Sequence, residues 1–133
     1  MVKTTTAIRT AVDAYVKNLE KDIRVDKVVL FGSYANGNPR AESDIDIAII
    51  SNELERYKPL EKIYLLADRR LGCDTQLAPL GYTLQQYQSA ERQSFIGEIK
   101  RTGKVIWERK KLRKRKPLIK PRSARPRRTA SRA

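Results

Sequence analysis

The sequence predicts one α/β (α+β) domain in which helices flank a small mixed β-sheet. Its 133 residues give room for a single core of ordinary size, and 40% of them are hydrophobic, which is enough to build that core. Apolar residues recur at helical spacing in some segments and form short β-rich runs in others. The predicted order is helix, strand, strand, helix, strand, helix, strand, with no internal repeat.

The first three elements follow from clear local patterns. Residues 4–23 place apolar side chains at helical spacing after a run of threonines that can cap a helix. The run VVLF at 28–31 is rich in β-formers and ends at Gly32 and Ser33. The run IDIAII at 45–50 is apolar on both faces, as in a buried strand. We therefore expect two adjacent core strands.

The second half of the domain is expected to hold two helical regions and two strands. Pro59 suits the start of a helix that Gly72 ends, and residues 73–78 predict a strand ended by Pro79. A capping box at 83–86 begins a helical region that runs to residue 101, and 104–107 predicts a final strand. The apolar face expected for the helix after Pro59 consists of Leu60, Ile63, Tyr64, Ala67 and Leu71.

Composition restricts the chemistry. The chain has no histidine and one cysteine, Cys73, which excludes a Ser-His or Cys-His nucleophile pair, a His-ligated zinc site and an internal disulfide. Catalysis must therefore rely on carboxylates, hydroxyls and bound hard cations. No segment resembles a membrane span or a secretion signal, so we expect a cytoplasmic protein that makes no membrane contact.

The net charge of +14 is concentrated at one end of the chain. Residues 1–108 hold 16 Lys and Arg against 15 Asp and Glu, whereas residues 109–133 hold 13 Lys and Arg and no acid. The second segment has three prolines and too few large aliphatic residues to offset its ordering entropy. We expect a folded domain over 1–108 and a disordered basic tail over 109–133, which would contact nucleic acid non-specifically.

Two carboxylates mark the start of the second strand. Asp44 and Asp46 are two residues apart, so on a strand both side chains leave the same face. At the start of a buried strand they would repel each other and lose hydration unless cations neutralise them. Mg²⁺ accepts one or two carboxylates together with nucleotide phosphates, and such a cluster can also bridge a metal pair.

The turn after the first strand offers groups that can bind a phosphate beside these carboxylates. Gly32 lets a ligand approach the backbone closely, and a helix starting at Ser33 would offer its N–H groups and hydroxyl to a phosphate. If the two strands pair antiparallel, these donors lie next to Asp44 and Asp46. The predicted site therefore binds a nucleoside triphosphate and divalent cations.

This combination resembles the minimal nucleotidyltransferases of the DNA polymerase β-like superfamily, over roughly residues 1–108. Members carry a strand, a Gly-Ser turn, a Gly-containing linker, an S-D-x-D motif on the next strand and a third carboxylate on a later strand. The matching residues are Gly32-Ser33, Gly37, Ser43-Asp44-Ile45-Asp46 and Asp74.

The resemblance implies a polymerase β-like fold and transfer of AMP from ATP. Asp44 and Asp46 would hold two Mg²⁺ ions, Gly32 and Ser33 would bind the triphosphate, and Asp74 would join the metal site and help activate the acceptor hydroxyl. Antitoxin members often carry Arg soon after the Gly-Ser turn. This chain has Asn36 there, with Arg40 four positions later.

The resemblance also implies a biological setting. Members of this size act as the antitoxin of a two-gene module, adenylylating a tyrosine hydroxyl of a HEPN-domain ribonuclease toxin, and a dimer or toxin-bound assembly would fit that role. Two alternatives stay open on the sequence. The acceptor could be RNA delivered by the basic tail, or the chain could neutralise a partner by binding alone.

Overall fold

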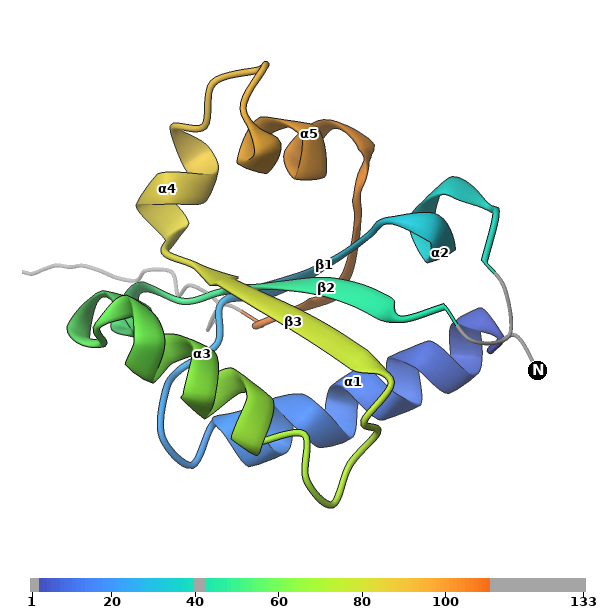
Figure 1. The fold of residues 1–133 in the computed structure, drawn as a ribbon, viewed down its shortest axis with the longest axis horizontal. Coiled ribbons are helices and arrows are strands. Elements are labelled where there is room, and N and C mark those ends of the chain that lie inside the picture. Colours follow the sequence, from blue (N-terminus) through green and yellow to red (C-terminus); the bar gives the residue numbers. More distant parts are fainter. Residues whose placement is uncertain (1–2, 40–42, 111–133) are drawn as a thin grey trace, which may run out of the picture.

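The computed structural model describes residues 3–39 and 43–110 (Figure 1). Within these ranges a four-stranded sheet is covered by helices on both faces. The elements are α1 (Thr5–Leu19), β1 (Lys27–Phe31), α2 (Ser33–Asn36), β2 (Ile45–Ile50), the 3-10 helix η1 (Asn52–Arg56), α3 (Pro59–Asp68), β3 (Leu77–Tyr82), α4 (Leu84–Gln88), α5 (Phe95–Thr102) and β4 (Lys104–Glu108).

The sheet is mixed, as the sequence predicted. Its strand order is β3-β2-β1-β4, with β1 antiparallel to both β2 and β4, and β2 parallel to β3. The register pairs Phe31 with Asp46 across β1 and β2, and Asp46 with Ala78 across β2 and β3. The two short runs expected to be adjacent core strands are therefore neighbours at the centre of the sheet.

Helices form a layer on each side of the sheet. Figure 1 shows α1 and α3 on one face and α4 and α5 on the other. Ile45, Ile47 and Ile49 of β2 pack in the core under α1 and α3, whereas Ala48 and Ile50 pack with α4 and α5. Because both faces of β2 are buried, its apolar residues follow one another directly and do not alternate with polar ones.

The local capping predictions are confirmed. The Thr4 hydroxyl accepts from the backbone N–H of Ala7 at 3.1 Å and begins α1. At α4, Thr83 and Gln86 form the predicted capping box, each side chain accepting from the other residue's backbone N–H. These motifs depend on neighbouring residues only, so the sequence is sufficient to predict them.

The prediction of which face of α3 is buried was wrong. Leu60, Ile63, Tyr64 and Leu71 are between 57% and 65% exposed, while Leu66 is 2% exposed and packs in the core. A Cβ on Gly81 of β3 would come within 2.9 Å of Leu66 Cδ1. This close approach of helix to strand selects the face that carries Leu66, and α3 keeps a second, exposed apolar face.

The third predicted strand was displaced in sequence. It was expected over 73–78 with Pro79 as its end, but β3 spans Leu77–Tyr82 and contains Pro79. Proline fits there because β3 is an edge strand and one side of it needs no backbone donor. Asp74 consequently lies before the strand and not on it.

The helices also differ from their predicted lengths. The first helix ends at Leu19 instead of residue 23, and α3 ends at Asp68, before Gly72 with its positive φ of 82°. The region 83–101 contains two helices, because Ser94 begins α5 with its own cap, its side chain accepting from Gly97 N–H at 2.9 Å. The local N-cap at Ser94 thus separates two helices where the apolar pattern predicted one helical region.

Arg109, the first residue after β4, is held against the folded domain by hydrogen bonds and an ion pair. The backbone N–H of Arg109 donates to Asp26 O at 3.0 Å, its Nε donates to Val25 O at 3.0 Å, and its guanidinium pairs with Glu20. Folded contacts thus continue through Arg109, while the rest of the expected basic tail, from residue 111, lies outside the described residues. No helix in the described ranges is long and apolar enough to cross a bilayer.

Candidate active site

The antiparallel pairing of β1 and β2 brings the Gly32 turn against Asp46. A Cβ placed on Gly32 would lie 2.2 Å from Asp46 Oδ2, and Gly32 has φ of +76°. Any other residue would therefore clash with the carboxylate and also adopt a strained backbone. The expected convergence of the turn with the second-strand carboxylates is confirmed at this position.

The segment after Gly32 is a single helical turn. Gly32 is the N-cap of α2, and its carbonyl accepts from the backbone N–H groups of Ala35 and Asn36, both at 3.0 Å. Gly37, in the left-handed region with φ of 84°, ends the turn. The half-buried Ser33 thus stands at the junction of β1 and α2, one residue from the position that contacts Asp46.

Asp44 and Asp46 differ in exposure. Asp46 is half-buried on β2, and burial raises the pKa of its carboxyl above the usual value, with the negative charge of Asp44 adding to the rise. Asp44 is exposed just before the strand. Among the described residues neither carboxylate accepts a hydrogen bond or forms an ion pair.

A carboxylate pair in this condition fits a hard divalent cation. Both groups offer oxygen ligands, the half-buried one is disfavoured as a free anion, and a bound cation would remove that penalty. Because Gly32 has no side chain, the Asp46 carboxylate packs directly against the backbone of the turn. The residues present therefore fit Mg²⁺, and Asp44 and Asp46 are the residues that would hold it.

Asp74 lies apart from this pair. It precedes β3, where its Oδ1 accepts from the backbone N–H of Gln76 at 2.8 Å and its Oδ2 pairs with Lys3 Nζ at 3.4 Å. In the described part of the chain, no three Asp, Glu or Cys residues gather closely enough to hold a metal ion. The structure thus brings together Gly32, Ser33, Asp44 and Asp46, and it does not add Asp74 to them.

A groove beside Asp46 is the feature that sequence reasoning missed. It encloses about 550 Å³, and its lining is mostly apolar. Phe31 and Phe95 meet there edge to face, with ring centroids 6.0 Å apart. The lining residues are Phe31, Asp46, Ile63, Ala67, Arg70, Ala78, Pro79, Leu80 and Phe95. No sequence signal links them, because they come from five separate elements and the loop after α3.

A second, larger hollow of about 850 Å³ lies along α3, and its lining residues fall between Arg56 and Leu71 in the sequence. It contains none of the predicted site residues, so we place the chemistry in the smaller groove, which contains Asp46. Arg40, which follows Asn36 by four positions, lies outside the described residues. Tyr15 is buried outside both hollows, and its hydroxyl donates to Leu66 O at 2.6 Å.

This fold and this site define a nucleotidyltransferase domain. The family model described as "Polymerase beta, Nucleotidyltransferase" matches residues 15–112. The chain therefore belongs to the polymerase beta nucleotidyltransferase family, and it is a nucleotidyltransferase, as the sequence motifs indicated.

Two comparisons agree with this assignment. A relative from Methanocaldococcus jannaschii, named "Putative protein adenylyltransferase", is 35% identical over 95 residues, which are 66% of this chain and 91% of the relative. The crystal structure of a "putative nucleotidyltransferase" from Sulfolobus solfataricus superposes with a TM-score of 0.59 at 15% identity, covering 80% of this chain and 86% of that one. The second comparison supports the fold alone.

Proposed function

We propose that the protein transfers AMP from ATP to a hydroxyl group of another protein, with Mg²⁺ as the cofactor. The observation that carries this proposal is the position of Asp46, which touches the Gly32 turn on one side and opens into an apolar groove on the other. A nucleotide site and an acceptor site can thus meet at one carboxylate. The name of the Methanocaldococcus relative supports the same reaction.

Asp44 and Asp46 would hold the magnesium ions. When bound, Mg²⁺ would lower the pKa of the attacking hydroxyl and offset charge on the leaving phosphates. Gly32 and Ser33 would hold the triphosphate, with Gly32 allowing close approach and Ser33 offering its hydroxyl. The hydroxyl oxygen attacks the α-phosphorus, the bond to the bridging oxygen breaks, pyrophosphate leaves and the hydroxyl proton passes to solvent.

The groove favours a protein acceptor over RNA. The cationic residue in its lining is Arg70, whose guanidinium already donates to the carbonyls of Ala67, Thr75 and Leu77. An RNA backbone would require several available cations, whereas an aromatic side chain such as tyrosine would pack against Phe31 and Phe95.

The exposed face of α3 supports a protein partner as well. Ile63 lines the groove and is 57% exposed, and it adjoins Leu60 and Tyr64 on the same helix face. A contiguous apolar surface next to a catalytic groove is typical of a protein interaction site. We propose that the partner is a HEPN-domain toxin and that the protein acts as its antitoxin, a step supported by the family resemblance.

The proposal is tested by incubating the purified chain with Mg²⁺, ATP and the protein encoded by the adjacent gene, followed by intact-mass analysis. We expect that protein to gain one or more AMP units, and we expect no gain with the Asp44→Asn, Asp46→Asn variant or with EDTA. A labelled RNA product in place of labelled protein would identify RNA as the acceptor. Partner neutralisation by the double variant, without transfer, would show that binding alone suffices.

A further inference from the structure

The strand beside Asp46 carries no acidic residue. Ala78 is the register partner of Asp46 on β3, and register partners on neighbouring strands place their side chains on the same face of the sheet. Both residues also line the groove. Neighbouring strands lie about 4.8 Å apart, which places position 78 within reach of any ion held by Asp46. The strand reads LAPLGY, so β3 supplies no third carboxylate.

Asp74 is engaged in a turn four residues before Ala78. The backbone N–H of Leu77 donates to Asp74 O at 3.2 Å and closes the turn, and the Asp74 carboxylate accepts from Gln76 N–H at 2.8 Å within it. Its other oxygen faces Lys3 Nζ. Both carboxylate oxygens therefore have partners that a metal would have to displace.

The partners of Asp74 connect it to both halves of the site. Gln76, whose backbone Asp74 holds, donates its side-chain amide to Ser43 O at 2.6 Å, directly before Asp44. Lys3 donates its backbone N–H to the Tyr34 hydroxyl at 3.2 Å, and Tyr34 follows Ser33 on α2. One turn thus supports the carboxylate strand on one side and the helix of the Gly-Ser turn on the other.

We infer that two carboxylates of the described residues, Asp44 and Asp46, form the metal site, and that Asp74 is a positioning residue which fixes them relative to Ser33. This inference rests on the proposed function, because it concerns the same site. It replaces the role that the family resemblance implied for Asp74, and it predicts that an acid at position 78 would complete a three-carboxylate site.

Mn²⁺ titration of the full chain, followed by the electron paramagnetic resonance of free Mn²⁺, tests the ligand assignment. We expect Asp46→Asn to weaken Mn²⁺ binding by about tenfold or more, and Asp74→Asn to change it by less than about threefold. Ala78→Asp should tighten binding about tenfold, while the uncharged control Ala78→Asn should not. In EDTA, Ala78→Asp should lower Tm, and added Mn²⁺ should restore it.

Kinetics test the positioning role. Asn at position 74 keeps an acceptor for Gln76 and loses the ion pair with Lys3, so we expect the KM for ATP to rise about threefold to fivefold with kcat nearly unchanged. Lys3→Met should raise KM equally, and the double variant should add nothing further. Loss of a metal ligand would instead lower kcat by about a hundredfold or more.

Three results would overturn the inference. Equal weakening of Mn²⁺ binding by Asp74→Asn and Asp46→Asn would make Asp74 a ligand. If Ala78→Asp bound Mn²⁺ no more tightly than Ala78→Asn, position 78 would not belong to the metal site. Wild-type binding no tighter than that of Asp46→Asn would reject the two-carboxylate site and the proposed function together, and only this third result affects the proposed function.

Discussion

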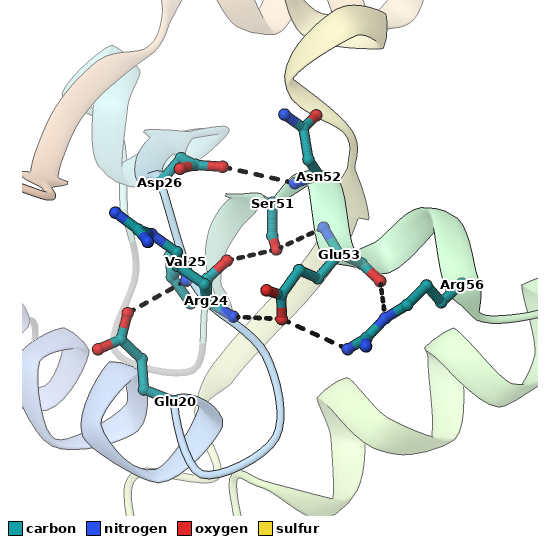
Figure 2. Close-up of polar contacts among 8 residues, drawn as sticks. All are labelled: Glu20, Arg24, Val25, Asp26, Ser51, Asn52, Glu53 and Arg56. Carbon is teal, nitrogen blue, oxygen red and sulfur yellow. Dashed lines mark hydrogen bonds and ion pairs between the residues drawn. The ribbon is translucent and has the colours of Figure 1, made fainter.

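The acidic residues at the two ends of the β1–β2 pair differ in whether their carboxylates have hydrogen-bond partners. Figure 2 shows the end near Ser51, where Glu53 Oε1 accepts from Arg24 N–H at 3.0 Å and pairs with Arg56 at 3.3 Å. Glu20 accepts there from Val25 N–H at 3.1 Å. At the other end, where Phe31 pairs with Asp46, neither Asp44 nor Asp46 has a donor among the described residues.

This difference separates acids that support the fold from acids that are available for binding. A carboxylate that accepts backbone N–H groups stabilises the loop that it closes. A half-buried carboxylate beside another anion is costly in the free protein, and the raised pKa of Asp46 reflects that cost. Substitutions at the two ends should therefore have opposite effects on stability and on activity.

The largest expected effect is on catalysis at the Asp46 end. Asp46→Asn should lower AMP transfer by about a thousandfold or more, because it removes a charge that holds the metal at the reacting phosphates. Glu53→Gln, at the Ser51 end, should leave the rate within about twofold. A discontinuous assay of labelled AMP incorporation compares the two, and equal losses would mean that the ends do not differ in function.

The next effect comes from the glycine that touches Asp46. Gly32→Ala should lower the free energy of unfolding by about 2–3 kcal/mol and also abolish ATP binding, because its Cβ meets Asp46 Oδ2 at 2.2 Å. Gly37 is the control, since its φ is also positive, its ψ of 13° lies in the left-handed helical region, and nothing lies within 4 Å of an added Cβ. Gly37→Ala should cost only about 1 kcal/mol and keep ATP binding.

Urea unfolding and calorimetric titration with ATP separate these two glycine effects. Gly32 has a ψ of −154°, in a region that almost only glycine adopts, so the difference between the two variants combines its larger backbone strain with the contact to Asp46. Equal stability and equal ATP affinity in the two variants would contradict the close approach between the turn and the carboxylate.

A moderate effect on stability alone is expected at the Ser51 end. The Ser51 side chain is buried, donates to Arg24 O at 2.5 Å and accepts from Glu53 N–H at 3.2 Å. Ser51→Ala should lower the free energy of unfolding by about 1–2 kcal/mol and leave AMP transfer unchanged. A drop in transfer rate at a temperature where the variant is fully folded would contradict this separation.

The smallest effect concerns pH and metal-free stability. The folded pKa of Asp46 is raised, so the folded state binds its proton more tightly than the unfolded state, and stability falls as pH rises from the usual carboxyl pKa through the raised one. At neutral pH in EDTA, Asp46→Asn should therefore raise Tm by roughly 2 °C. Mg²⁺ should stabilise the wild type and not the variant, as thermal unfolding scans would show.

Several features followed from the sequence alone. The Asp44 and Asp46 spacing, the Gly32-Ser33 turn and the Thr4 and Thr83 caps each lie within a few residues, so strand periodicity and side-chain to backbone hydrogen bonding define them locally. The absence of histidine already limited the chemistry to carboxylates and hard cations. These properties require no knowledge of which elements touch.

The remaining features depend on contacts between elements that lie far apart in the sequence. Helix α3 carries two apolar faces, and contact with Gly81 on β3 determined that Leu66 would be buried and Ile63 exposed. Pairing with β2 fixed where β3 begins, which placed Ala78 and not Asp74 beside Asp46. The groove joins Phe31 to Phe95, 64 residues later in the chain. Such contacts depend on which surfaces fill the core together, and local sequence periodicity does not encode that choice.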